Sequence, residues 1–277
     1  MSPQVWSSKK RMALITLQKD NLQYLHDSEI SVSHGFTTRL GGVSKDHLAS
    51  LNLGVNRGDD RENVEQNYRI LASGLGFDLN KLVLAHQIHS DIVRVVTASD
   101  SKGIDHRAYP ECDALVTNDP GVTLGVFTAD CTPILYYDPV TGAVGAAHAG
   151  WRGTAAGIAG KTVQKMVEAF GCNPSDIRCA IGPNIGPCCF ETDREVPEAM
   201  IAALGDSVLP YITAKGNKFH LDLKQINALF LRQAGVERIT VSTDCTMCQW
   251  ERFWSHRKTG GFRGSQGAFI KREEERV

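Results

Sequence analysis

Residues 126–153 read VFTADCTPILYYDPVTGAVGAAHAGWRG, with Cys131 inside one apolar run and His148 inside a second. A residue that favours turns follows each of them, Pro133 after the cysteine and Gly150 after the histidine. Two strand-like segments that end in a thiol and an imidazole can lie side by side. The stretch therefore predicts either a cysteine–histidine catalytic pair or two ligands of a soft metal.

The composition is that of a globular protein with a sizeable core. The chain has 277 residues, of which 42% are hydrophobic and 22% are charged. A net charge of −1 lacks the basic excess of dedicated nucleic-acid-binding proteins, so no nucleic-acid partner is expected. No apolar run approaches the roughly 20 residues of a membrane span. The apolar run after Lys9–Arg11 stops at Gln18, which argues against a signal peptide and predicts a cytoplasmic protein with reduced cysteines.

The segments around this stretch predict one α/β domain (mixed α+β) over residues 1–277. Helices are expected where apolar side chains recur on one face, and strands where short apolar runs end in turn residues. They alternate loosely, without the regular spacing of a doubly wound sheet. Thr132 and Pro133 are expected to turn the chain, and the charged tail 271–277 to fray. The expected helices are 60–76, 154–171, 193–204 and 221–235, and the expected strands lie within 33–44, 82–96, 114–118, 122–130, 177–183 and 238–244.

A second histidine can complete the site. His86 and His89 lie three residues apart, so on a strand they would point to opposite faces and only one would join Cys131 and His148. Their spacing does not choose between them. One cysteine and two histidines are a suitable set for zinc, with a fourth position left for water or substrate. The alternative is a metal-free site in which a histidine takes the proton of the Cys131 thiol.

Two arginines are candidates for binding phosphate or carboxylate. Arg152 follows Gly150 at an expected helix start, where free N–H groups favour anions, and Arg39 lies in TTRLGG. His256, Arg257 and the segment 260–264 are expected to form a basic loop near the same site.

Four further cysteines form two short motifs. Cys188 and Cys189 are adjacent in GPCCFE, and Cys245 and Cys248 form a CxxC in DCTMCQW. A CxxC is a zinc half-site, but adjacent cysteines are a poor second half. Packing is therefore the favoured interpretation, with a structural zinc site or a redox pair as the alternatives.

Several motifs together resemble one family. They are HGFTTRLGGVS, QIHSD, CDALVTNDPGVTLGVFTADCTPIL, AAHAGWRGT, AIGPNIGPCCFE, FHLDL and DCTMC followed by FWSHR, spread in order over residues 33–264. This is the YfiH-like family, also labelled laccase-domain or multicopper polyphenol oxidase. The resemblance implies two mixed sheets packed between helices in layers. It also implies a zinc site formed by His89, Cys131 and His148, with Cys131 as a ligand.

The resemblance implies a zinc-dependent purine nucleoside enzyme. Its substrates would be phosphate with adenosine, inosine and S-methyl-5′-thioadenosine, and it would also deaminate adenosine. One alternative is copper-dependent oxidation of phenols, which the nine scattered histidines, without an HxH pair, do not favour. Others are a peptidoglycan-precursor amidase and a zinc-stabilised scaffold. The sequence indicates no oligomeric state.

Overall fold

Strands β8 (Thr132–Tyr137) and β9 (Val144–Ala149) are the antiparallel centre of the fold in a computed structural model that describes residues 13–274. They belong to a six-stranded sheet, sheet 2, with the order β14-β10-β8-β9-β6-β5. Facing it is sheet 1, also six-stranded, with the order β1-β2-β3-β15-β7-β4. A third, small sheet has the order β11-β13-β12.

The other strands of sheet 1 and sheet 2 have the following bounds. Sheet 1 contains β1 (Ile15–Lys19), β2 (Leu22–His26), β3 (His34–Thr37), β15 (Gln266–Lys271), β7 (Thr123–Thr128) and β4 (Leu82–Leu84). Sheet 2 is completed by β14 (Arg238–Val241), β10 (Arg178–Ile181), β6 (Ala114–Thr117) and β5 (Val93–Val95). The small sheet contains β11 (Glu191–Thr192), β13 (Lys218–Leu221) and β12 (Ile212–Lys215).

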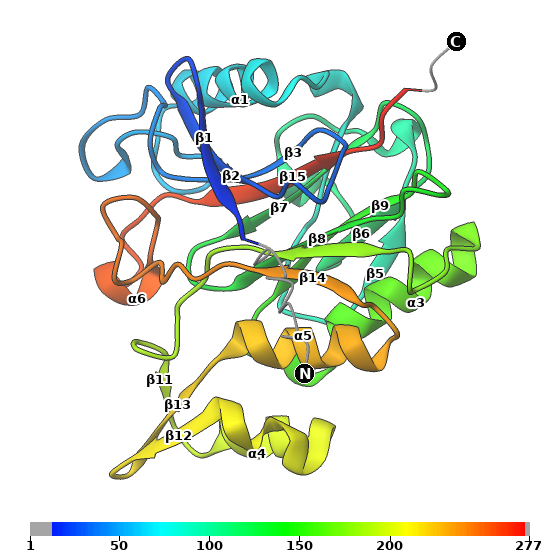
Figure 1. The fold of residues 1–277 in the computed structure, drawn as a ribbon. Coiled ribbons are helices and arrows are strands. Elements are labelled where there is room, and N and C mark those ends of the chain that lie inside the picture. The colour runs from blue at the N-terminus through cyan, green and yellow to red at the C-terminus, as the bar shows by residue number, and fades with distance from the viewer. Residues whose placement is uncertain (1–12, 275–277) are drawn as a thin grey trace, which may run out of the picture.

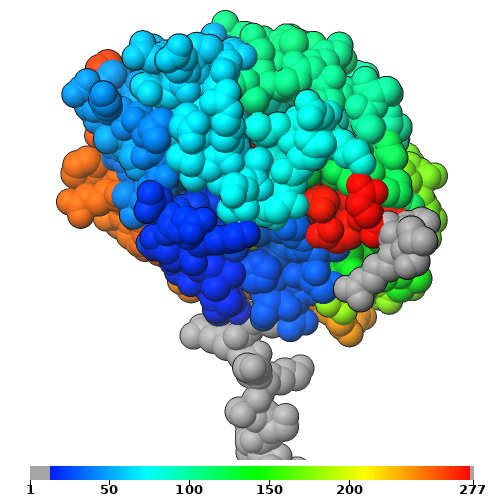
Figure 2. Space-filling model, turned by 90° about the horizontal axis from the view of Figure 1, so that it is seen from above, coloured from blue at the N-terminus to red at the C-terminus, as the bar shows by residue number. Residues whose placement is uncertain are grey.

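The helices enclose the sheets in layers, as Figure 1 shows. Helix α1 lies over sheet 1, sheet 2 lies beneath it, and α3 and α5 cover the lower face of sheet 2. Helix α4 lies lower still, beside the small sheet. Seen from above, α1 and the β1–β2 hairpin form much of that face (Figure 2). The α-helices are α1 (Arg61–Leu75), α2 (Trp151–Ala155), α3 (Ile158–Phe170), α4 (Glu195–Leu204), α5 (Leu223–Gln233) and α6 (His256–Thr259).

Strand β8 contributes to two cores because its side chains alternate between the faces of sheet 2. Leu135 and Tyr137 belong to the core between the two sheets. Ile134 and Tyr136 belong to the core between sheet 2 and helices α3 and α5. Burial on both faces explains why the strand reads as a continuous apolar run.

The expected fold class is confirmed, with mixed sheets between helices, but several local predictions are wrong. Thr132 and Pro133 begin β8, and the turn comes earlier, at residues 129–131. The helix expected at 154–171 is divided into α2 and α3 by Gly157, whose φ of 77° is left-handed. Lys271 belongs to β15 rather than to a frayed tail.

Other sequence predictions agree with the structure or lie outside it. The helix at 60–76 is found as α1, which ends at the left-handed Gly76, and the segment 82–96 forms two strands, β4 and β5, separated by a loop. The basic run Lys9–Arg11 lies outside the described residues. Within residues 13–274, no helix is both long enough and apolar enough to span a bilayer.

Candidate metal centre and the cavities beside it

The pairing of β8 with β9 brings Cys131 to His148. Thr132 pairs with Ala149 and Pro133 with His148, so Cys131, just before β8, lies at the end of β9. His89 reaches the same point from the loop between β4 and β5. The ligand atoms of the three side chains all lie within 4.8 Å of one another. The structure thus brings together the three residues that the sequence analysis selected.

The distances fit a metal site. His89 Nε2 lies 3.9 Å from Cys131 Sγ, and the two imidazole rings are nearly perpendicular, at 86° with centroids 4.9 Å apart. Tetrahedral zinc with ordinary bond lengths would separate a sulfur and a nitrogen ligand by about 3.6 Å. His148 is buried, Cys131 is half-buried and His89 is exposed, so the centre is reached from one side.

Asp113 fixes both histidines. Its Oδ1 accepts a hydrogen bond from His148 Nδ1 at 2.8 Å, which leaves Nε2 of that ring free to act as a ligand. The carboxylate also accepts the backbone N–H groups of Ile88, His89 and Ser90 and the Ser90 hydroxyl. These bonds hold His89 at a left-handed φ of 63°. They also outweigh the effect of burial and lower the pKa of Asp113 to about 2.

Cys131 and His148 shift each other's pKa. Burial alone would raise the pKa of Cys131, but the neighbouring His148 and His89 lower it to about 6. Burial alone would lower the pKa of His148, but Cys131 and Asp113 raise it to about 9. The interaction therefore favours a Cys131 thiolate beside a protonated His148, and the thiolate is the form that binds a metal.

A cavity of about 200 Å³ opens on this centre and carries three arginines. Arg57 and Arg107 are exposed at its rim, and Arg263 is half-buried. Burial and the nearby Arg57 charge lower the pKa of Arg263 to about 10. Its buried Nε has no hydrogen-bond partner among the described residues, nor has Nδ1 of His106 in the same wall. Three arginine side chains around one opening make this cavity suited to an anion.

A second cavity, of about 270 Å³, is lined by Cys131 and His89 from another side. Asp130, at a left-handed φ of 86°, accepts hydrogen bonds from the Thr246 hydroxyl at 2.6 Å and the Arg257 backbone at 2.7 Å. The predicted basic segment lies beside the centre, but His256 and Arg257 belong to helix α6 rather than to a loop. The cavity lining includes Ile185, Phe190, His256, Arg257 and Arg263.

The two arginines selected from the sequence line neither cavity. Arg39 donates to the carbonyl groups of Ala49 and Trp250 and lies over the Trp254 ring. Arg152 is exposed and stacks on Trp151. Their role in phosphate binding stays a prediction. His86 also lies outside the cavity lining, where it bonds to the Tyr109 carbonyl and contacts His106 edge-on.

Sequence reasoning missed the residues that approach the centre from distant segments. Arg57 comes from an irregular segment, His106 and Arg107 come from the short 3-10 helix His106–Ala108, and Asp113 immediately precedes β6. Their one available signal was the polar or charged character of the side chain. Such a signal does not say which distant segment a side chain will face.

Comparisons with known proteins identify the family of the chain. Residues 33–273 match the family described as "Multi-copper polyphenol oxidoreductase laccase". The chain is 44% identical to "Purine nucleoside phosphorylase YlmD" of Geobacillus stearothermophilus, over 87% of this chain and 90% of that protein. It is 37% identical to "Purine nucleoside phosphorylase YfiH" of Escherichia coli, over 80% of this chain and 86% of that protein.

A solved structure supports the same family. The crystal structure of YlmD from Geobacillus stearothermophilus superposes with a TM-score of 0.88 at 41% identity, covering 94% of this chain and 100% of that one. The fold, the sequence match over most of the chain and the order of the motifs agree. The chain belongs to the YfiH/YlmD family, whose sequence model has the multi-copper polyphenol oxidoreductase laccase description.

Proposed function

We propose that this chain is a zinc-dependent purine nucleoside phosphorylase that also deaminates adenosine. The observation that carries the proposal is the arginine-bearing cavity that opens on His89, Cys131 and His148. Relatives that share the fold and up to 44% of the aligned sequence have the name purine nucleoside phosphorylase. A phosphorylase needs an anion site beside its reacting centre, and this cavity has that arrangement.

The donor set fits zinc. One thiolate and two imidazoles are ligands that zinc prefers, and a carboxylate behind a ligating histidine is a common arrangement in zinc sites. His89, Cys131 and His148 would hold the ion, and the open side would leave room for one further ligand. When bound there, zinc would supply Lewis-acid polarisation of a substrate or water oxygen.

The cavity residues would bind the two substrates. Arg57, Arg107 and Arg263 would hold phosphate through charge-assisted hydrogen bonds. The rings of His106 and Phe127 lie 5.4 Å apart in the same wall and offer an apolar surface for a purine. Gln87 fixes that wall, because its amide bonds both the N–H and the carbonyl of Phe127.

Phosphorolysis in this site requires little covalent chemistry from the protein. A phosphate oxygen forms a bond to C1′ of the ribose while the bond from C1′ to the purine nitrogen breaks, and the departing base takes up one proton. The products are the free base and ribose 1-phosphate. The arginines would orient phosphate for this attack and spread its charge. Deamination is a separate reaction, in which water replaces the amino group at C6 of adenine and ammonia leaves.

The proposal is tested with purified protein supplied with zinc, phosphate and one nucleoside at a time. Adenosine and inosine are expected to give base and ribose 1-phosphate, S-methyl-5′-thioadenosine to give adenine and S-methyl-5-thioribose 1-phosphate, and adenosine is also expected to give inosine. Cys131→Ala and His148→Ala should lose these products, whereas Cys172→Ser, a buried thiol elsewhere, should keep them. Equal rates in wild type and Cys131→Ala would refute the proposal.

The same preparation separates the alternative activities. Oxygen consumption with a phenol after copper loading, without any nucleoside product, would favour an oxidase. Release of the amino acid from UDP-MurNAc-L-Ser, without any nucleoside product, would favour an amidase. Either result would overturn the assignment of a nucleoside as the substrate.

A further inference from the structure

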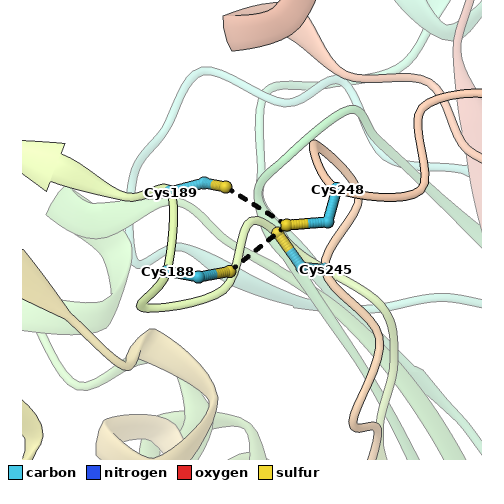
Figure 3. A group of neighbouring side chains, drawn as sticks. All are labelled: Cys188, Cys189, Cys245 and Cys248. Carbon is cyan, nitrogen blue, oxygen red and sulfur yellow. Dashed lines mark hydrogen bonds between the residues drawn. The ribbon is translucent and has the colours of Figure 1, made fainter.

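A second group of metal-binding side chains lies apart from the centre described above. It consists of Cys188, Cys189, Cys245 and Cys248, named here the four-cysteine cluster, whose sulfur atoms all lie within 4.8 Å of one another. Figure 3 shows the four side chains converging from two loops. Cys248 Sγ lies 3.5 Å from Cys188 Sγ and 3.4 Å from Cys189 Sγ, and all four thiols are free.

Strand pairing explains why the adjacent pair Cys188–Cys189 lies next to the CxxC of Cys245 and Cys248. Strands β10 and β14 are parallel neighbours, with Ile181 paired to Val241, so the segments that follow them leave sheet 2 at the same edge. The pairing continues beyond the strands, because Asn184 and Cys245 form a parallel bridge and Thr246 N–H donates to the Asn184 carbonyl at 2.9 Å. The adjacent cysteines are therefore placed opposite the CxxC, which spacing along the sequence does not reveal.

We propose that the four-cysteine cluster binds one structural Zn²⁺ through four thiolates. Four sulfur ligands are a common set for structural zinc, and they leave no position for substrate. A tetrahedron with zinc–sulfur bonds of about 2.3 Å has sulfur–sulfur edges of about 3.8 Å. The observed separations of 3.4 and 3.5 Å approach these edges and are far from the roughly 2.05 Å of a disulfide bond.

The surroundings of the cluster suit an anionic metal–thiolate group. The backbone N–H groups of Gly186 and Cys248 both donate to the Cys245 sulfur, the former at 3.2 Å. Lys224, only 4% exposed, interacts electrostatically with Cys245 and Cys188. Zinc with four thiolates has a net charge of about −2, so a buried ammonium and backbone donors would balance it.

The proposed zinc would join two loops that build the second cavity. Ile185 and Phe190 lie on either side of the Cys188–Cys189 pair and line that cavity. Thr246, between the two cysteines of the CxxC, donates its hydroxyl to Asp130, the residue before Cys131. The metal would thus hold the wall next to the proposed reacting centre without touching a substrate.

The first test is metal analysis of the whole protein, purified under reducing conditions without chelator. To separate the two sites, the measurement uses His148→Ala, which lacks a ligand of the other centre. This variant is expected to retain about one zinc per chain. Adding Cys248→Ser should remove that zinc, whereas adding Cys172→Ser, which lies outside both groups, should not.

The absorption spectrum of bound Co²⁺ shows whether thiolates are among the metal ligands. In Co²⁺-loaded His148→Ala protein, the cluster should give strong thiolate-to-cobalt charge-transfer absorption together with the visible bands of a tetrahedral site. Cys248→Ser should weaken both signals. A cobalt spectrum with no thiolate contribution in His148→Ala, or no metal retained by that variant, would overturn the proposal.

A measurement on unaltered protein covers the case in which the variants fold poorly. Titration of wild type with a mercurial reagent should release about two zinc ions per chain, one from the four-cysteine cluster and one from the centre that contains Cys131, and release of one or none would count against the proposal. Mass spectrometry of the reduced preparation should find no disulfide within the cluster. Isolation of a Cys188–Cys248 or Cys189–Cys248 disulfide in place of bound zinc would contradict the proposal. Neither result depends on nucleoside turnover, so failure here is distinguishable from failure of the proposed function.

Discussion

Asp113 Oδ1 lies 2.8 Å from His148 Nδ1, and the same carboxylate accepts the backbone N–H of His89. One buried side chain therefore orients both imidazoles of the proposed zinc centre. Asp113→Asn should weaken zinc binding at this centre by about 10–100-fold, since loss of the carboxylate behind a ligating histidine has effects of that size.

The affinity is measured by competition with a chromophoric chelator in a Cys248→Ser background, in which the four-cysteine cluster is disabled. Asp119→Asn is the matched control, because Asp119 bonds the backbone of Ala98 away from the centre. Unchanged zinc affinity in Asp113→Asn would show that the carboxylate does not position the ligands.

Arg263 and Arg152 are rival candidates for binding phosphate, and the cavity favours Arg263, which lines it, over Arg152, which does not. Arg263→Gln should raise the KM for phosphate by about 10–100-fold, because one charge-assisted hydrogen bond contributes about 1.5–3 kcal/mol. Steady-state kinetics at saturating nucleoside measures this constant. Arg152→Gln should leave it unchanged, and the opposite pattern would support the arginine selected from the sequence.

Gly150 is expected to be required for its lack of a side chain. A Cβ atom at this position would lie 2.8 Å from His89 Cδ2 and 3.4 Å from Cys131 Sγ, although the backbone φ of −67° suits any residue. Gly150→Ala should displace the His89 ring and weaken zinc binding by about tenfold or more.

Gly160→Ala provides the comparison for that substitution. Gly160 lies inside α3 and its Cβ would make only ordinary contacts, the nearest at 3.4 Å. This variant should bind zinc normally and gain about 0.5–1 kcal/mol of stability, as alanine does over glycine inside a helix. Zinc titration and urea unfolding of both variants check the pair, and equal zinc affinity in the two would count against the predicted displacement.

Protonation of His34 is expected to lower the stability of the fold in mild acid. Its Nε2 accepts the Asp27 N–H at 3.0 Å and its Nδ1 donates to the Val32 carbonyl, so only the neutral ring satisfies both bonds. Burial lowers the pKa of His34 from 6.5 to about 4. The unfolded chain binds this proton first as the pH falls. The contribution of neutral His34 to the free energy of unfolding is therefore complete above pH 6.5. It is lost as the pH falls towards 4, and the loss reaches up to about 3 kcal/mol.

Urea unfolding at several pH values measures this loss. His34→Gln should show a smaller fall in the free energy of unfolding between pH 7 and pH 4.5 than wild type. An equal fall in both proteins would assign the acid sensitivity to other groups.

The sequence predicted the parts of the molecule that rest on local pattern. Helix α1 follows from its apolar face and its terminal glycine, and β9 follows from the apolar run that contains His148. Strand β8 was not predicted, because Thr132 and Pro133 read as a turn in the sequence. The break in the expected helix at 154–171 was missed because Gly157 looks like a tolerated helix glycine in sequence, whereas its positive φ is set by tertiary structure.

The site was predictable where its residues lie in strand ends and not where they come from loops. Cys131 and His148 are brought together by the register of two neighbouring strands, a relationship that a short connection makes probable from sequence alone. Arg57, Arg107 and Asp113 reach the same place through long-range packing, for which a single sequence has no local signal. The four-cysteine cluster was undervalued for the same reason, since it depends on the pairing of β10 with β14.

Strand β15 lies between β3 and β7, although more than 130 residues separate it from either in the chain. Until residues 266–271 emerge from the ribosome, sheet 1 consists of two separate parts, β1-β2-β3 and β7-β4. Each part has an unpaired hydrogen-bonding edge where β15 will lie. Arg263 and its cavity wall also arrive at that late moment. Sheet 1 and the arginine-bearing cavity are therefore completed together during synthesis, and a chain that lacks these residues would expose unpaired strand edges that favour aggregation.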